Sequence, residues 1–151
     1  MATSVSREVV IEASPEEIFA VVADVESTPT WSPQYQKAEV VDRDAEGRPH
    51  RVIQTIKTVG ISDQLTIDYT WEENKVSWVL VKASQLKSQE CSYTLTPEGD
   101  KAGSPRTKVR FDMTIDLAIP LPGFILKQVM KGAIDVATSG LRKQVLKVKK
   151  G

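Results

Sequence analysis

The feature that most constrains the fold is a region of about eighty residues, from Gln34 to Leu117, in which apolar and polar side chains alternate. Successive side chains of a β-strand point to opposite faces, so each alternating segment predicts a strand with one buried face. Short turns, such as those at Gly47 and at residues 72–74, separate neighbouring segments. Because short connections join antiparallel neighbours, the region predicts an antiparallel meander. The expected strands are 34–43, 51–58, 65–71, 76–80, 89–95 and 109–117, and residues 97–105 are expected to form a mobile polar loop.

A further strand and a capped helix precede this region. The strand ends near Ile11, where apolar and polar residues again alternate. Ser14 can accept a hydrogen bond from an early backbone N–H of the helix, and Glu17 can complete a capping box. Pro15 suits the first helical position, where its missing N–H costs nothing. The pattern therefore predicts a helix from this cap until the proline-rich segment 29–33 stops it.

The C-terminal part of the chain predicts one long helix. Residues 120–123, Pro-Leu-Pro-Gly, break the last strand, and from there to about Lys149 only Gly132 and Gly140 interrupt the helical pattern. Apolar side chains fill about half of the helix circumference, which is a wider face than the roughly 100° stripe of an ordinary surface helix. A helix with such a face suits a broad concave surface.

The element order is therefore one strand, one or two short helices, about six strands and one long helix. An antiparallel sheet with a helix on one face is an α+β architecture. We expect a curved antiparallel sheet of about seven strands (β-α-α-β6-α) wrapped around the long C-terminal helix. Side chains alone do not fill the space under a strongly curved sheet, so we also expect an interior pocket, mostly apolar with a few polar groups.

Length and composition narrow the class of protein. A chain of 151 residues is expected to form a single domain over residues 1–151. Its 20 basic residues balance its 20 acidic residues, which gives no indication of a nucleic-acid partner. The single cysteine, Cys91, excludes an internal disulfide and fits a reducing compartment. The sequence shows neither a signal peptide nor an apolar run of about 18 residues, so a soluble, cytoplasmic protein is expected.

Two motifs carry a resemblance to a known family. They are I-E-A-S-P-E-E-I-F-x-x-V-A-D-V-E-x-x-P-x-W, which starts at Ile11, and D-x-x-I-P-L-P-G, which starts at Asp116. Together with the element order, they resemble the START-like or Bet v 1-like (SRPBCC) superfamily over essentially the whole chain. Tyr69-x-Trp71 and Ser77-Trp78 narrow the resemblance to the stand-alone polyketide cyclase/dehydrase-type proteins that are frequent in actinobacteria.

The resemblance implies a helix-grip fold whose cavity takes lipids, polyketides, sterols or other hydrophobic molecules. It implies no single reaction, because the superfamily includes cyclases, transfer proteins, hormone receptors and co-chaperones. The function must therefore be inferred from the residues of the site.

Few residues suit catalysis or metal binding. The one histidine, His50, follows a polar turn, which favours a solvated loop residue over a catalytic base. Cys91 shares a predicted face with Tyr93 and Leu95, so we interpret it as a small buried hydrophobic residue. One histidine and one cysteine, with no acidic cluster at ligand spacing, argue against a site with three or four converging metal ligands. No phosphate-binding or dinucleotide motif is present, so neither a metal nor a cofactor is expected.

Polar and aromatic side chains on inward faces are the remaining candidates. Glutamine and tyrosine side chains there could orient a ligand that bears carbonyl or hydroxyl groups, although aromatic rows on a sheet are as often plain core. Tyr93→Phe is therefore expected to alter ligand affinity and barely change the melting temperature. Trp31 is expected to pack a short second helix over the cavity mouth. The predicted ligand-binding residues are Val9, Ile11, Val52, Gln54, Ile56, Leu65, Ile67, Tyr69, Trp78, Leu80, Gln89, Cys91, Tyr93, Val109, Phe111, Met113, Ile125, Val129 and Ala133.

Three functions stay open at this point. The first is binding or transport of a hydrophobic small molecule (a lipid, fatty acid or polyketide-like compound), with the loop 57–63, hinged at Gly60, and the turn 120–123 controlling entry. The second is a polyketide cyclase/aromatase-type enzyme. The argument against it is that the sequence places no general base with a tunable pKa among the inward-facing residues. The third is a protein-interaction module that uses the exposed sheet surface.

Expectations about partners follow from the same features. No nucleic acid is expected as a partner, and the chain is expected to be a monomer or a weak dimer. The basic residues from Arg142 onward suit transient contact with an anionic membrane, although a solvated helix end explains them as well.

Overall fold

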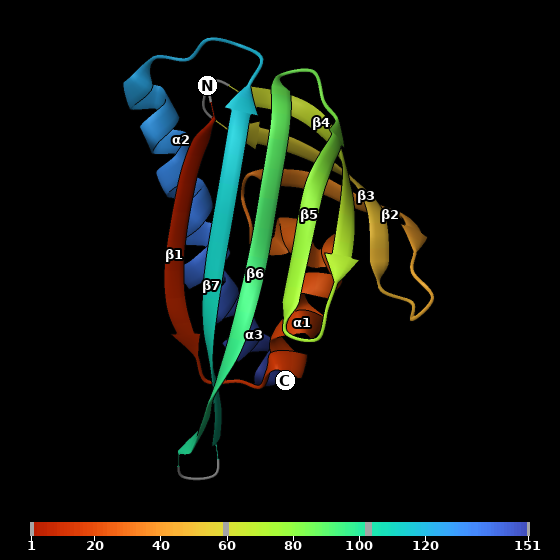
Figure 1. The fold of residues 1–151 in the computed structure, drawn as a ribbon, viewed down its shortest axis with the longest axis vertical. Coiled ribbons are helices and arrows are strands. Elements are labelled where there is room, and N and C mark those ends of the chain that lie inside the picture. The colour runs from red at the N-terminus through yellow and green to blue at the C-terminus, as the bar shows by residue number, and fades with distance from the viewer. Residues whose placement is uncertain (1, 59–60, 102–103, 151) are drawn as a thin grey trace.

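The computed structural model describes residues 2–58, 61–101 and 104–150. Within these residues, seven strands form one antiparallel sheet in the order β1-β7-β6-β5-β4-β3-β2 (Figure 1). Consecutive strands from β2 to β7 are neighbours, which is the meander that the alternation predicts, and β1 pairs with β7 at one edge. The strands are β1 (Thr3–Ile11), β2 (Tyr35–Arg43), β3 (Pro49–Thr58), β4 (Ile61–Trp71), β5 (Lys75–Lys82), β6 (Leu86–Lys101) and β7 (Ser104–Leu117).

The helices lie on one face of this sheet (Figure 1). The predicted element order and the predicted wrapping of a curved sheet around the C-terminal helix are confirmed. Among the described residues, no helix is long and apolar enough to cross a membrane. The helical segments are α1 (Pro15–Ala23), the 3₁₀ helix η1 (Val25–Thr30), α2 (Gly123–Asp135), the π-helical turn η2 (Val136–Gly140) and α3 (Leu141–Lys149).

The start of α1 has the capping geometry that its sequence predicts. The Ser14 hydroxyl accepts a hydrogen bond from the Glu17 N–H at 3.2 Å. The Glu17 carboxylate accepts one from the Ser14 N–H at 2.9 Å, which completes the capping box. The chain therefore turns from β1 into α1 within three residues, and this turn brings α1 and η1 under the sheet.

The C-terminal helix contains one wide turn that its sequence period does not predict. In η2 the N–H of Leu141 donates to the carbonyl of Val136, five residues back instead of four. The buried Thr138 hydroxyl donates to the Ile134 carbonyl at 2.7 Å, a contact that tends to bend helices. A π turn inserts one extra residue into the helix and is frequent at functional sites.

Residues 97–101 and 104–105 do not form the loop that the polar composition of 97–105 predicts, and residues 102 and 103 lie outside the described residues. The pairing of β6 with β7 continues up to Lys101 opposite Ser104. The register shifts just after Pro97, where Gly99 has a φ of 85°. Glycine adopts this conformation without steric cost, so a bulge accommodates the proline and the two strands extend as a narrow ribbon beyond the sheet (Figure 1).

Residues 57–58 and 61–63, which were expected to belong to an entry loop, are also paired as strands. β3 runs to Thr58 and β4 starts at Ile61, and these two residues are partners across the strand pair. The alternation of inward and outward side chains continues to Thr58 in β3 and from Ile61 in β4, which explains why the two strands are longer than predicted. Gly60, the expected hinge, lies outside the described residues.

Ion pairs attach the end of the C-terminal helix to the N-terminal elements. Arg142 on α3 donates two hydrogen bonds to the Glu12 carboxylate, at 3.3 and 2.7 Å. These hydrogen bonds lower the pKa of Glu12. Lys149 donates to the Glu12 backbone carbonyl at 3.0 Å. Two of the basic residues that suit a membrane contact therefore also hold α3 against the N-terminal segment.

Candidate ligand-binding cavity

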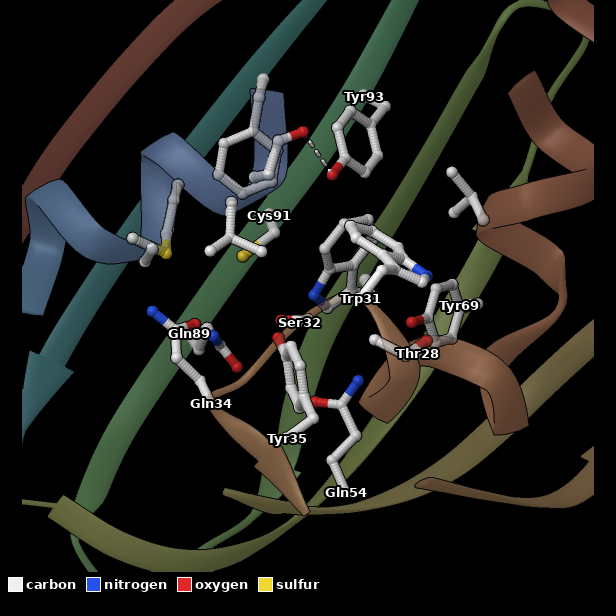
Figure 2. A pocket seen from close by; sticks show the side chains of 17 residues that line it. Thr28, Trp31, Ser32, Gln34, Tyr35, Gln54, Tyr69, Gln89, Cys91 and Tyr93 are labelled. Atoms are coloured by element: carbon white, nitrogen blue, oxygen red, sulfur yellow. Dashed lines mark hydrogen bonds between the residues drawn. The ribbon is translucent and has the colours of Figure 1, made fainter. Parts of the chain in front are cut away.

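A cavity lies between the concave face of the sheet and the helices, in two compartments of ≈ 70 Å³ each. The first compartment lies under η1 and the π turn, and the second lies under α2 beside the β3–β4 hairpin. Five residues border both compartments, and we call them the partition; Figure 2 labels three of them, Gln34, Tyr35 and Gln89, in the wall of the first compartment. The partition consists of Gln34, Tyr35, Gln89, Met113 and Ala133.

Aromatic rings from four neighbouring strands form the sheet side of the first compartment. Tyr69 on β4 stacks on Trp78 on β5, with ring centroids 5.2 Å apart. Trp78 contacts Tyr93 on β6 at 5.6 Å, and Tyr93 contacts Phe111 on β7 at 5.0 Å. Each such pair adds about 0.5–1.5 kcal/mol to the stabilisation that burial alone provides. The rings therefore brace one another and present apolar faces to the cavity.

Three polar side-chain atoms of the residues that line the cavity are inaccessible to solvent and have no hydrogen-bond partner within the described residues. They are the Trp31 Nε1–H, the Ser32 hydroxyl and the Gln89 amide oxygen. Figure 2 shows their side chains around the same space. An unpaired buried polar group costs about 1–3 kcal/mol, and native proteins pair nearly all such groups with protein, water or ligand. These atoms therefore mark the cavity as a place that suits a molecule with polar groups.

Burial keeps the titratable side chains of the cavity neutral. Desolvation raises the pKa of Tyr35, of Tyr69 and of the Cys91 thiol. None of the described residues that line either compartment is Asp, Glu, Lys, Arg or His. The described wall therefore lacks a group that gains or loses a proton near neutral pH, which is what general acid–base catalysis requires.

His50 lies away from the cavity and is not in a loop. It is the second residue of β3, because Pro49 already pairs with Arg43 on β2. Its Nδ1 lies 2.9 Å from the exposed Asp42 carboxylate. Across the described part of the chain, no three His, Cys, Asp or Glu side chains gather as metal ligands.

The predicted ligand-binding residues divide into two groups. Those that line a compartment are Gln54, Ile56, Leu65, Tyr69, Trp78, Gln89, Cys91, Tyr93, Phe111, Met113, Val129 and Ala133. Those that instead pack within or against the core are Val9, Ile11, Val52, Ile67, Leu80, Val109 and Ile125. Alternation identifies the inward face of a strand, but the cavity occupies only part of the concave face, and packed side chains fill the rest.

The predicted ligand-binding residues do not include those that follow Trp31. Ser32, Gln34 and Tyr35 line the cavity together with Trp31. Tyr35 lies beside a register shift in β2, so the alternation of that strand does not mark it as inward-facing. The sequence signal that could have identified these residues is the proline-bounded segment 29–33. Prolines on both sides of Trp31 favour a turn, and such a turn can place the following residues over the concave face of the sheet.

A comparison with known protein families classifies the chain. Residues 2–146 match the family model described as polyketide cyclase / dehydrase and lipid transport. The chain belongs to this family. It matches no curated protein.

Solved structures have the same fold. A START superfamily protein from Mycobacterium smegmatis is 23% identical, with a TM-score of 0.83 over 96% of this chain and 98% of that one. A protein from Thermus thermophilus is 24% identical, with a TM-score of 0.76 over 97% and 99% of the two chains. An aromatase/cyclase from Streptomyces sp. R1128 is 10% identical, with a TM-score of 0.72 over 96% and 94%. At these identities the structures show the fold alone, and they confirm the predicted helix-grip fold.

The hydroxyl of Tyr93 has a structural partner, which changes the expectation for Tyr93→Phe. It donates to the Ala137 carbonyl of the π turn at 2.8 Å (Figure 2). The substitution should therefore lower the free energy of unfolding by about 1–2 kcal/mol, because that carbonyl loses a partner. Urea denaturation measures the loss. Tyr69→Phe is the matched control, since the Tyr69 hydroxyl makes no hydrogen bond to the described residues; equal losses in both variants would contradict this role of Tyr93.

Proposed function

We propose that this protein binds and carries a hydrophobic small molecule in the cavity between the sheet and the C-terminal helix. The observation that supports this most directly is an interior lined by aromatic and aliphatic side chains with three unpaired polar atoms. Ligand sites typically have this composition, with a mostly apolar wall and a few polar groups that orient the ligand. The description of the family, which includes lipid transport, supports the same class of function.

The chemistry of the wall favours binding over catalysis. A cyclase needs a group that accepts or donates a proton as carbon–carbon bonds form, and its pKa must lie near the working pH. The tyrosine and cysteine side chains of this cavity have raised pKa values, so they stay protonated near neutral pH. The similarity to an aromatase/cyclase therefore concerns the fold. The described cavity wall has no side chain that could transfer a proton near neutral pH, so it does not support a cyclase reaction.

The size of the cavity adds a requirement. Each compartment measures ≈ 70 Å³, whereas pockets for small molecules usually measure about 300–1,000 Å³. Binding therefore requires the interior to open. Displacement of the partition would provide such an opening, because the five residues border both compartments and their movement would join the two volumes.

A fluorescence titration with N-phenyl-1-naphthylamine, a neutral dye that brightens in apolar surroundings, tests the proposal. The wild-type protein should bind the dye. Ala133→Phe places a ring at a residue that lines both compartments, so it should weaken binding by about tenfold or more. Ala118→Phe, at an exposed position just after β7, is the matched control and should bind as the wild type does. A wild type that binds no dye, or equal binding by Ala133→Phe, would refute the proposal.

A further inference from the structure

The cavity wall constrains the charge of its ligand. Every described residue that lines either compartment is uncharged. Moving an ionic group from water into such a space, with no counter-charge to meet it, is strongly unfavourable. A carboxylate or phosphate could therefore enter only by losing its charge or by staying outside the cavity.

The unpaired polar atoms constrain the hydrogen-bonding groups of the ligand. The Gln89 amide oxygen can only accept a hydrogen bond, and the Trp31 Nε1–H can only donate one. The Ser32 hydroxyl can do either. A ligand that satisfies all three must carry both a donor, such as a hydroxyl, and an acceptor, such as a carbonyl or hydroxyl oxygen. A plain hydrocarbon would leave these atoms unpaired and would retain their cost.

We infer that the site selects an uncharged molecule that carries hydroxyl or carbonyl groups, with Gln89 as the acceptor that determines specificity. This inference rests on the proposed function and narrows its ligand class. Fatty acids and phospholipids, which carry an ionised head group, are disfavoured. Neutral, oxygen-bearing apolar molecules are favoured, because they match the wall in both charge and hydrogen bonding.

A matched pair of dyes tests the selection against charge on the wild-type protein. 1-Anilinonaphthalene-8-sulfonate has the skeleton of N-phenyl-1-naphthylamine and adds one sulfonate near the middle of the molecule, so the charge cannot stay outside while the rings enter. We expect it to bind about 100-fold more weakly than the neutral dye. Equal affinities would overturn the inference and leave the proposed function intact. Failure of both dyes to bind would refute the proposed function itself.

A second pair of probes tests the role of Gln89. Phenol and toluene have similar shapes, and only phenol carries a hydroxyl, so competition against the neutral dye gives their affinity ratio in each protein. Gln89→Leu should shift this ratio about tenfold towards toluene, because the hydroxyl loses its acceptor. Gln128→Leu, at an exposed position on α2, is the matched control and should leave the ratio unchanged. An unchanged ratio in Gln89→Leu would overturn the assignment of Gln89.

Discussion

Tyr35→Ala should bind N-phenyl-1-naphthylamine about tenfold more tightly than the wild type. The side chain of Tyr35 borders both compartments, each of ≈ 70 Å³. Its removal should join them into one cavity that is larger than their sum. In the wild type the dye has to displace the ring of Tyr35, and the free energy of that displacement weakens the observed affinity. The alanine variant removes this cost.

A comparison with Tyr35→Phe isolates the effect of the ring. Phenylalanine keeps the ring and therefore the partition, so this variant should bind the dye as the wild type does. Tyr35→Ala should also lower the free energy of unfolding by about 2–4 kcal/mol, because a large side chain leaves a void. Tighter binding by a less stable protein distinguishes a removed partition from general damage. If both variants bind the dye equally, the partition does not limit ligand entry.

Ile67→Ala should lower the free energy of unfolding by about 2–5 kcal/mol and leave dye binding unchanged. Ile67 lies on β4 with 0% of its surface exposed, within the core cluster and away from both compartments. Deleting part of its side chain creates a new void in closely packed surroundings. Chemical denaturation measures the loss of stability, and the dye titration on the folded variant measures binding.

Val79→Ala is the control for this substitution. Val79 lies on the neighbouring strand β5 and is 45% exposed, so its truncation should change the free energy of unfolding by less than about 0.5 kcal/mol. A loss below about 1 kcal/mol in Ile67→Ala would contradict its placement in the core. Dye binding weakened as strongly as in Ala133→Phe would instead place Ile67 on the cavity wall.

Much of the fold could be predicted because its signals are local. The capping box at Ser14 and Glu17 forms as the sequence indicates, since both partners lie within one helical turn. The meander follows from alternation and short turns. The prediction of a polar loop after Pro97 was wrong, because one residue changes the local geometry. Gly99 permits a bulge, and β6 and β7 stay paired on both sides of it. The π turn at residues 136–140 could not be predicted from the sequence, because the apolar residues on both sides of it recur at ordinary helical spacing.

The candidate site could be predicted only in part. Gln89 and Cys91 line the cavity on the face that the alternation of β6 marks as inward. Tyr35 could not be predicted as a cavity residue, because a register shift in β2 interrupts the alternation of inward and outward side chains next to it. The partner of the Tyr93 hydroxyl lies 44 residues away on the C-terminal helix, and no local pattern relates the two.

Side-chain periodicity is a local property of the chain, so the sequence alone indicates which face of each strand points inward and that a broad-faced helix covers the sheet. Which of the inward residues border empty space depends instead on the tertiary structure. Leu65, Ile67 and Tyr69 share one face of β4, and yet Leu65 and Tyr69 line the two compartments while Ile67 between them is packed core. A void is the space that the side chains of distant elements leave unfilled, so its position depends on packing across the whole molecule.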